Sequence, residues 1–135
     1  MNTLLCLGHG YSAATLSARL IPLGWRVLGP TRTPARADEM RALGVEPLLW
    51  PGELTAALQD ATHILASAAP DGSGDPFLQS DRAALQAAKP AWVGYLSTTA
   101  VYGDHNGAWV DEDTPVTPQS ARAVQRVLAE RQWLA

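Results

Sequence analysis

The sequence predicts an α/β protein with a parallel sheet of about five strands and helices on both faces. Short apolar runs alternate with segments of helical spacing along the whole chain, and glycines and prolines separate them. The run at residues 92–97 is nearly all apolar, which is typical of a parallel strand covered on both faces. Because parallel strands are joined by right-handed crossovers, these observations predict a doubly wound sheet.

The expected strands are short apolar runs bounded by turn residues. They cover residues 4–7, 25–28, 45–50, 62–67 and 92–97. The expected helices cover residues 12–20, 35–43, 54–58, 76–88 and 119–134. Gly44 is placed to end the second helix. Asn106-Gly107 is a strong hairpin signal and predicts a small hairpin over residues 101–110 after the fifth strand.

Composition and charge limit the classes of protein to which the chain can belong. The 135 residues, 47% hydrophobic and 17% charged, indicate one ordinary globular domain. A net charge of −3 provides no basic surface for nucleic acid. No apolar run approaches about 18 residues and no basic leader follows Met1, so neither a membrane partner nor a signal peptide is expected, and the expected location is the cytoplasm. The single cysteine, Cys6, lies inside the first strand and is expected to be a buried thiol.

A glycine turn follows the first predicted strand. Its spacing is Gly8-x-Gly10-x-x-Ala13. Gly8 allows a sharp turn, Gly10 allows the backbone to approach a pyrophosphate, and Ala13 lets the helix pack closely on the strand. The N–H groups at the start of that helix then face the phosphates. The pattern predicts a Rossmann-like, NAD(P)-binding βαβ unit.

Ligands of such sheets bind at the carboxyl ends of the strands, where the ends of four predicted strands meet. The cofactor-binding residues predicted there are Gly8, His9, Gly10, Tyr11, Ser12, Thr31, Arg32, Ser67, Ala68, Ala69 and Ser97. An NAD-selective turn carries Asp or Glu after the second strand, whereas Thr31 and Arg32 stand here. Since Arg32 suits a 2′-phosphate, NADP is expected over NAD, the alternative being that Arg32 is a surface turn residue.

The three histidines are interpreted separately. His9 is expected to be an exposed loop histidine, with a contact to the pyrophosphate as the alternative. His63 begins a strand and is expected to be a satisfied structural residue, and His105 a turn residue. They are too scattered, and too poorly supported by acids at ligand spacing, to predict a metal site.

Residues 95–104, Tyr-Leu-Ser-Thr-Thr-Ala-Val-Tyr-Gly-Asp, complete a pattern that begins with the glycine turn. Together they resemble the extended and atypical short-chain dehydrogenase/reductases, the NAD-dependent epimerase/dehydratase family. The resemblance covers the whole chain but only the first half of such a protein, without its substrate-binding C-terminal part. It implies a catalytic hydroxyl at Thr98, an acidic, proline-marked loop at Glu112, Pro115 and Pro118, and a sugar-nucleotide or other small carbonyl or alcohol substrate.

One departure bears on the chemistry. The family's Tyr-x-x-x-Lys pair, counted back from Glu130, falls on Arg122 and Arg126. A guanidinium stays protonated at physiological pH, so Arg122 cannot deliver a proton as a tyrosine does. Two functions therefore stay open: an oxidoreductase in which Arg126 replaces the lysine, and a non-catalytic dinucleotide-binding sensor or scaffold. His105 is a lesser candidate for the lost acid, and S-adenosylmethionine-dependent methyl transfer lacks the acid it needs after the second strand.

The resemblance also implies self-association. Family members dimerise by packing the helices that correspond to residues 76–88 and 119–134 into a four-helix bundle. Here those helices carry an apolar surface formed by Leu78, Leu85, Val124, Leu128 and Trp133. A homodimer through these helices is therefore expected.

Overall fold

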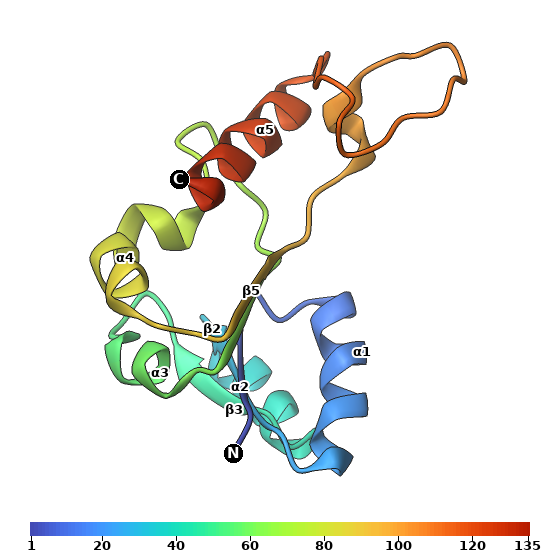
Figure 1. Cartoon of the computed structure of the whole chain (residues 1–135). Coiled ribbons are helices and arrows are strands. Elements are labelled where there is room, and N and C mark those ends of the chain that lie inside the picture. Colours follow the sequence, from blue (N-terminus) through green and yellow to red (C-terminus); the bar gives the residue numbers. More distant parts are fainter. The chain divides into compact units, whose positions relative to one another are not determined.

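In the computed structural model, which describes residues 1–135, five parallel strands form one sheet in the order β3-β2-β1-β4-β5 (Figure 1). The strands are β1 (Thr3–Leu7), β2 (Arg26–Thr31), β3 (Glu46–Leu49), β4 (His63–Ala66) and β5 (Trp92–Tyr95). The chain proceeds outward from β1 to β3 and then returns to β4, so the strand order reverses between β1 and β4. The Rossmann-like fold class is confirmed, and its switch point lies beside the glycine turn.

Helices connect the strands. They are α1 (Tyr11–Leu20), α2 (Pro34–Ala42), α3 (Thr55–Asp60), α4 (Pro76–Ala87) and α5 (Ala121–Leu134), with short 3-10 helices η1 (Ile21–Leu23) and η2 (Thr99–Tyr102). Figure 1 shows α1 on one side of the sheet and α3 on the other, as expected for a doubly wound sheet. None of the helices combines the length and apolar character needed to cross a bilayer.

The chain divides into two compact units. The first comprises residues 1–68 and 81–96 and holds the sheet, and the second comprises residues 69–80 and 97–135 and holds α5. The boundary falls inside α4, where Asp81 departs from helical geometry with φ −124° and ψ 20°. The helix expected over residues 76–88 is therefore kinked near its middle.

The core of the first unit is built around β1, whose five residues are all buried. Ala13 of α1 and Met40 of α2 pack against this strand from the same cluster. Cys6 lies in the cluster, and burial raises the pKa of its thiol to about 12. The expected buried cysteine is confirmed, and at neutral pH it carries no thiolate.

Two strand predictions are corrected. β2 was expected to end at Leu28 but continues to Thr31, because residues 29–31 pair with β3 beyond the last residue that pairs with β1. Pro30, which lacks an N–H group, is tolerated where only one neighbouring strand remains. The fifth strand was expected to be covered on both faces. β5 is instead the edge strand, with Trp92 48% and Val93 47% exposed.

The hairpin expected over residues 101–110 is not formed. Its turn is present, since Asn106 and Gly107 have φ of 53° and 80° and the His105 carbonyl accepts from the Ala108 N–H at 3.0 Å. The flanking residues do not pair as strands. Val101 is buried in η2, and its carbonyl accepts instead from the Thr117 N–H at 3.0 Å. The predicted turn at Asn106-Gly107 is thus confirmed. The predicted strand pairing is wrong, because the Val101 carbonyl pairs with the more distant Thr117 backbone.

Candidate functional site

The glycine turn between β1 and α1 lies against the end of β4. Gly8 has φ +106°, and a Cβ there would lie 2.8 Å from the Ala68 nitrogen. The Leu7 carbonyl accepts from the N–H groups of Ser67 and Ala68, and Ser67 Oγ donates to the Gly8 carbonyl at 3.0 Å. Both the backbone conformation and the space therefore require glycine at position 8.

At position 10, neither the backbone conformation nor the available space requires glycine. Gly10 is exposed, its φ is −94°, and a Cβ there would meet nothing within 4 Å. Gly10 is the N-cap of α1 and has no side chain to accept from the first-turn N–H groups, and that turn contains no acidic residue. By contrast, Thr33 caps α2 and Ser120 caps α5 with side-chain hydrogen bonds. The start of α1, with Tyr11 and Ser12, therefore offers uncapped N–H groups and positive dipole to an anion.

His9, between the two glycines, is only 8% exposed, so the expectation of an exposed loop histidine is wrong. Its Nε2 lies 3.0 Å from Ser17 Oγ, and Ser17 Oγ donates to the Ala13 carbonyl at 2.7 Å. The single hydroxyl proton is thus used, which makes Nε2 the donor to Ser17 and leaves Nδ1 as a buried acceptor without a partner. Burial, and secondarily the charge of Arg36, lower the pKa of His9, so the ring is neutral at physiological pH.

The end of β2 carries the residues expected to read the cofactor ribose. Thr31 is 7% exposed and contributes little surface to a ligand. Arg32 is exposed, and its guanidinium carbon lies 4.9 Å from the ring centroid of Trp50. Stacking on the indole restricts where the guanidinium can reach.

Arg36, in the first turn of α2, is a residue that the sequence analysis did not select. Its Nη2 donates to the His9 carbonyl at 3.1 Å, and its Nη1 pairs with Glu39 Oε2 at 2.8 Å. This contact spans 27 residues and depends on how α2 packs beside the glycine turn. No local signal could have found it.

The residues expected to carry the chemistry lie in the second unit. Thr98 is exposed and caps η2, its Oγ1 accepting from the Ala100 N–H at 3.3 Å. Ser97 Oγ donates to the Glu130 carboxylate. Arg122 is exposed and Arg126 half-buried, and with Glu130 they follow one another at four-residue intervals on α5. Such spacing places them on one helix face, the face that reaches Ser97.

The other histidines have structural partners. His105 Nε2 lies 2.8 Å from the Tyr102 carbonyl, in agreement with a turn residue. His63 Nδ1 lies 2.8 Å from Thr62 Oγ1, and its ring meets Trp25 edge-on at 4.7 Å between centroids. No group of three or more His, Cys, Asp or Glu side chains is placed to hold a metal ion.

The predicted site residues thus fall into two sets. The first unit holds the glycine turn with Thr31, Arg32, Ser67 and Ala68, at the carboxyl ends of β1, β2 and β4. The second unit holds Ala69, Ser97, Thr98, Arg122 and Arg126.

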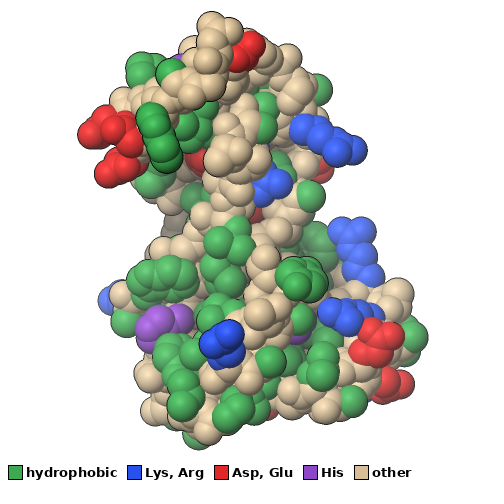
Figure 2. All heavy atoms as spheres, turned by 90° about the vertical axis from the view of Figure 1, so that its right-hand side faces the viewer, with side chains coloured by type: hydrophobic (Ala, Val, Ile, Leu, Met, Phe, Trp, Pro, Cys, Tyr) green, Lys and Arg blue, Asp and Glu red, His purple; other side chains and the backbone are tan.

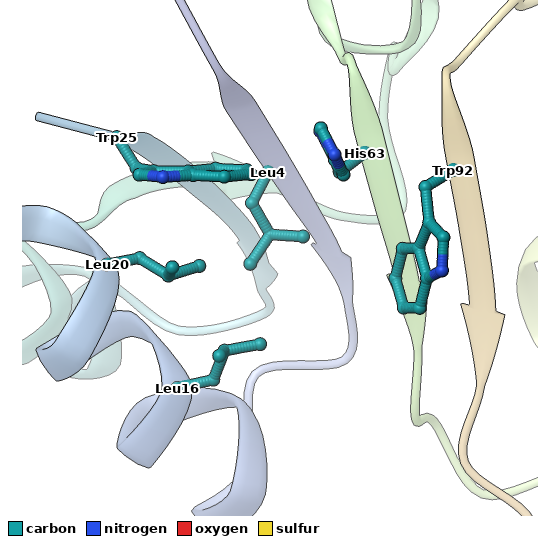
Figure 3. A pocket seen from close by; sticks show the side chains of 6 residues that line it. All are labelled: Leu4, Leu16, Leu20, Trp25, His63 and Trp92. Carbon is teal, nitrogen blue, oxygen red and sulfur yellow. The ribbon is translucent and has the colours of Figure 1, made fainter. Parts of the chain in front are cut away.

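The first unit also has an apolar hollow of about 270 Å³ at the amino ends of the strands, away from the glycine turn. Figure 3 shows its lining: Leu4, Leu16, Leu20, Trp25, His63 and Trp92. Hydrophobic side chains are widespread on the α1 side of this unit (Figure 2). Four of the six lining residues are leucine or tryptophan side chains of β1, α1 and the segment before β2, so the hollow differs chemically from the glycine turn.

Among the comparisons with known proteins, only solved structures match the chain. No protein-family profile and no curated protein matches the chain. A functionally unknown conserved protein from Silicibacter pomeroyi DSS is 57% identical with a TM-score of 0.90, over 100% of this chain and 49% of that one. TunA, an NAD-dependent NDP-hexosamine 5,6-dehydratase involved in tunicamycin biosynthesis, is 21% identical with a TM-score of 0.73, over 98% and 48%. UDP-glucose-4-epimerase from Stenotrophomonas maltophila, with bound NAD and formylated UDP-arabinopyranose, is 18% identical with a TM-score of 0.68, over 99% and 48%.

The fold and the glycine turn define a Rossmann-type α/β chain. More particularly, it has the fold of the NAD-dependent epimerase/dehydratase type of short-chain dehydrogenase/reductase, and it spans about half the length of these solved structures.

Proposed function

We propose that the chain is the NAD(P)-binding domain of an epimerase- or dehydratase-like oxidoreductase that acts on a sugar nucleotide. The observation that carries this proposal is the uncapped start of α1 beside a glycine turn with open space at Gly10. It is supported by the similar fold of an NAD-dependent dehydratase and of an epimerase with bound NAD. The NDP-hexosamine of the dehydratase and the UDP-sugar bound to the epimerase suggest the substrate class.

The residues at the turn fit the pyrophosphate of a dinucleotide. A Cβ at Gly10 would fill the space from which a phosphate reaches the first-turn N–H groups of α1. Gly8 and Ser67 hold the turn against β4, so the N–H groups are oriented before a ligand arrives. The nicotinamide ring, when bound, accepts or returns a hydride.

We further propose that NADP is preferred over NAD. The residue after β2 is Arg32 rather than an acid, and its guanidinium suits a phosphate better than a ribose hydroxyl. The contact with Trp50 holds the guanidinium near the end of the strand. This reduces the conformational entropy lost on binding the 2′-phosphate.

For the chemistry, Thr98 would orient the substrate oxygen, and Arg126 would supply positive charge in place of a lysine. Arg122, at the position of the family's tyrosine, cannot donate a proton at neutral pH. Because a positioned acid contributes about 10² to 10⁴ in rate, we expect slow or undetectable turnover of ordinary carbonyl substrates. This same observation favours the second candidate function, a dinucleotide-binding sensor or scaffold without catalysis.

The test is the substitution Gly10→Val. Since nothing lies within 4 Å of a Cβ at this position, the fold should be retained, while the side chain excludes the phosphate and NADPH binding by calorimetry is lost. Gly72→Val is the matched control, because a Cβ at Gly72 also meets nothing within 4 Å but lies outside the turn. Unchanged NADPH affinity in a folded Gly10→Val variant contradicts the proposal.

A further inference from the structure

Resting on the proposed function, we infer that Arg36 is a positioning residue for the dinucleotide phosphates. It is inferred to act by holding the peptide between His9 and Gly10, without itself contacting the ligand. The contact is a charge-assisted hydrogen bond of 3.1 Å from Nη2 to the His9 carbonyl. No other side-chain donor to that carbonyl is present.

The geometry of the peptide group gives this bond its consequence. A trans peptide is planar, and its C=O and N–H point in opposite directions. Fixing the His9 carbonyl toward α2 therefore fixes the Gly10 N–H away from α2. Gly10 is exposed and has no side chain to limit its backbone, so this external bond restricts a residue that would otherwise sample many conformations.

Arg36 is itself held in place. Its backbone N–H donates to Thr33 Oγ1 at 3.3 Å, which caps α2, and its Nη1 pairs with Glu39 at 2.8 Å. The ion pair with Glu39 offsets part of the guanidinium charge, although that charge still lowers the pKa of His9 in the turn. The role inferred for Arg36 is orientation of the turn, in addition to any direct attraction of an anion.

His9 adds a second restraint on the turn, through its contact with α1. Its imidazole is buried and bound to Ser17 of α1, while its carbonyl is bound to Arg36 of α2. One residue therefore links the turn to both helices. The phosphate-binding backbone is organised before ligand arrives, which lowers the entropic cost of binding.

The experiment compares Arg36→Met with wild-type chain by calorimetry with NADPH, NADH and inorganic pyrophosphate, and by thermal melting. Loss of the bond should weaken all three ligands by a similar factor, about five- to tenfold, because all three use the same turn. Arg36→Lys should recover part of the affinity, since an ammonium can still donate to the carbonyl. Arg41→Met is the matched control, because Arg41 makes the corresponding ion pair with Asp38 on the same helix but does not touch the turn.

Each other outcome overturns the inference. A lower melting temperature with unchanged affinity at a temperature where the variant is folded shows a merely structural role. A loss confined to NADPH shows that Arg36 touches the 2′-phosphate. Equal losses in Arg36→Met and Arg41→Met show a general effect of α2. Failure of the wild-type chain to bind any dinucleotide overturns the proposed function, and the inference with it.

Discussion

At the residue scale, burial changes the protonation of one side chain, the imidazole of His9. The imidazole is neutral and buried, with Nε2 bound to Ser17. Burial holds its pKa below the usual 6.5, because a charged ring would lose its hydration. The folded chain therefore resists a protonation that the unfolded chain accepts.

This predicts a pH dependence of stability. Below about pH 6.5 the unfolded chain binds more protons at His9 than the folded chain does, so the free energy of unfolding falls as pH falls, until the folded pKa is reached. The steepest loss attributable to this group is about 1.4 kcal/mol per pH unit. Denaturant melts between about pH 7 and about pH 5 should show a shallower decline in His9→Gln than in the wild type. His105→Gln, which removes a half-buried turn histidine, is the control, and identical slopes in the wild type and His9→Gln would refute this account.

Arg32 provides a second prediction at this scale. Arg32→Asp removes the proposed partner of a 2′-phosphate and installs an acceptor for a ribose hydroxyl. NADPH binding should weaken by about 2 kcal/mol, while NADH binding is kept or improved. Trp50→Leu, which removes the stacking partner and the hydrogen bond from Trp50 Nε1 to Asp81 but keeps the guanidinium, should cause a smaller loss in the same direction. Equal effects of Arg32→Asp on both cofactors would show that Arg32 does not read the phosphate.

At the element scale, the second unit is tied together by one buried carboxylate. Asp75 is fully buried; its Oδ1 accepts from the N–H groups of Phe77 and Leu78, and its Oδ2 accepts from Trp133 Nε1 at 3.1 Å. The start of α4 and the end of α5 thus share one acceptor. The adjacent Gln132 accepts from the Asp75 N–H at 2.9 Å.

Removing that acceptor should loosen both helices together. Asp75→Ala deletes three hydrogen bonds to a charged group and is expected to cost about 3 kcal/mol of the free energy of unfolding. Trp133→Phe removes the Nε1 donor and keeps the other two hydrogen bonds to Asp75, and it should cost about half as much. Asp71→Ala, in the same loop, is the control: it removes an exposed acceptor of the Ser73 N–H and of Gln79 Nε2 and should cost no more than about 1 kcal/mol. Urea denaturation measures the three differences, and an Asp75→Ala variant as stable as Asp71→Ala would contradict this role.

At the scale of the whole molecule, α5 exposes an apolar surface. Val124 is 53% and Leu134 87% exposed. Beside α5 lies a hollow of about 310 Å³ lined by Val116, Pro118, Val124, Val127, Leu128 and Arg131. We therefore keep the homodimer through the helices at residues 76–88 and 119–134 as a proposal, with α5 as its main contributor.

Light scattering at micromolar concentration should then give a dimer mass. Val124→Asp places a charge in the proposed interface and should shift the chain to monomer without unfolding it, because the position is half exposed. Leu23→Asp, at a 74% exposed position of the first unit, is the control and should leave the dimer intact. A monomer mass for the wild type would exclude this association.

The sequence alone determined the parts that depend on local patterns. Apolar runs and helical spacing predicted the five strands and their connecting helices, because periodicity records which face of an element is buried. The Gly8 turn and the Asn106-Gly107 turn were also predictable, since each needs positive φ that glycine and asparagine adopt most readily. The buried Cys6 followed from its place within an apolar strand.

Tertiary structure decided whatever depends on a distant neighbour. His9 lies in a polar-looking loop, yet Ser17 and the packing of α1 bury it. The contact of Arg36 with the glycine turn and that of Ser97 with Glu130 each join residues far apart in the chain. The predicted hairpin is not formed because the Val101 carbonyl accepts from the Thr117 N–H and not from a neighbouring strand. Local propensity cannot register such partners, because a buried polar group takes its hydrogen bond from whichever segment the fold brings to it.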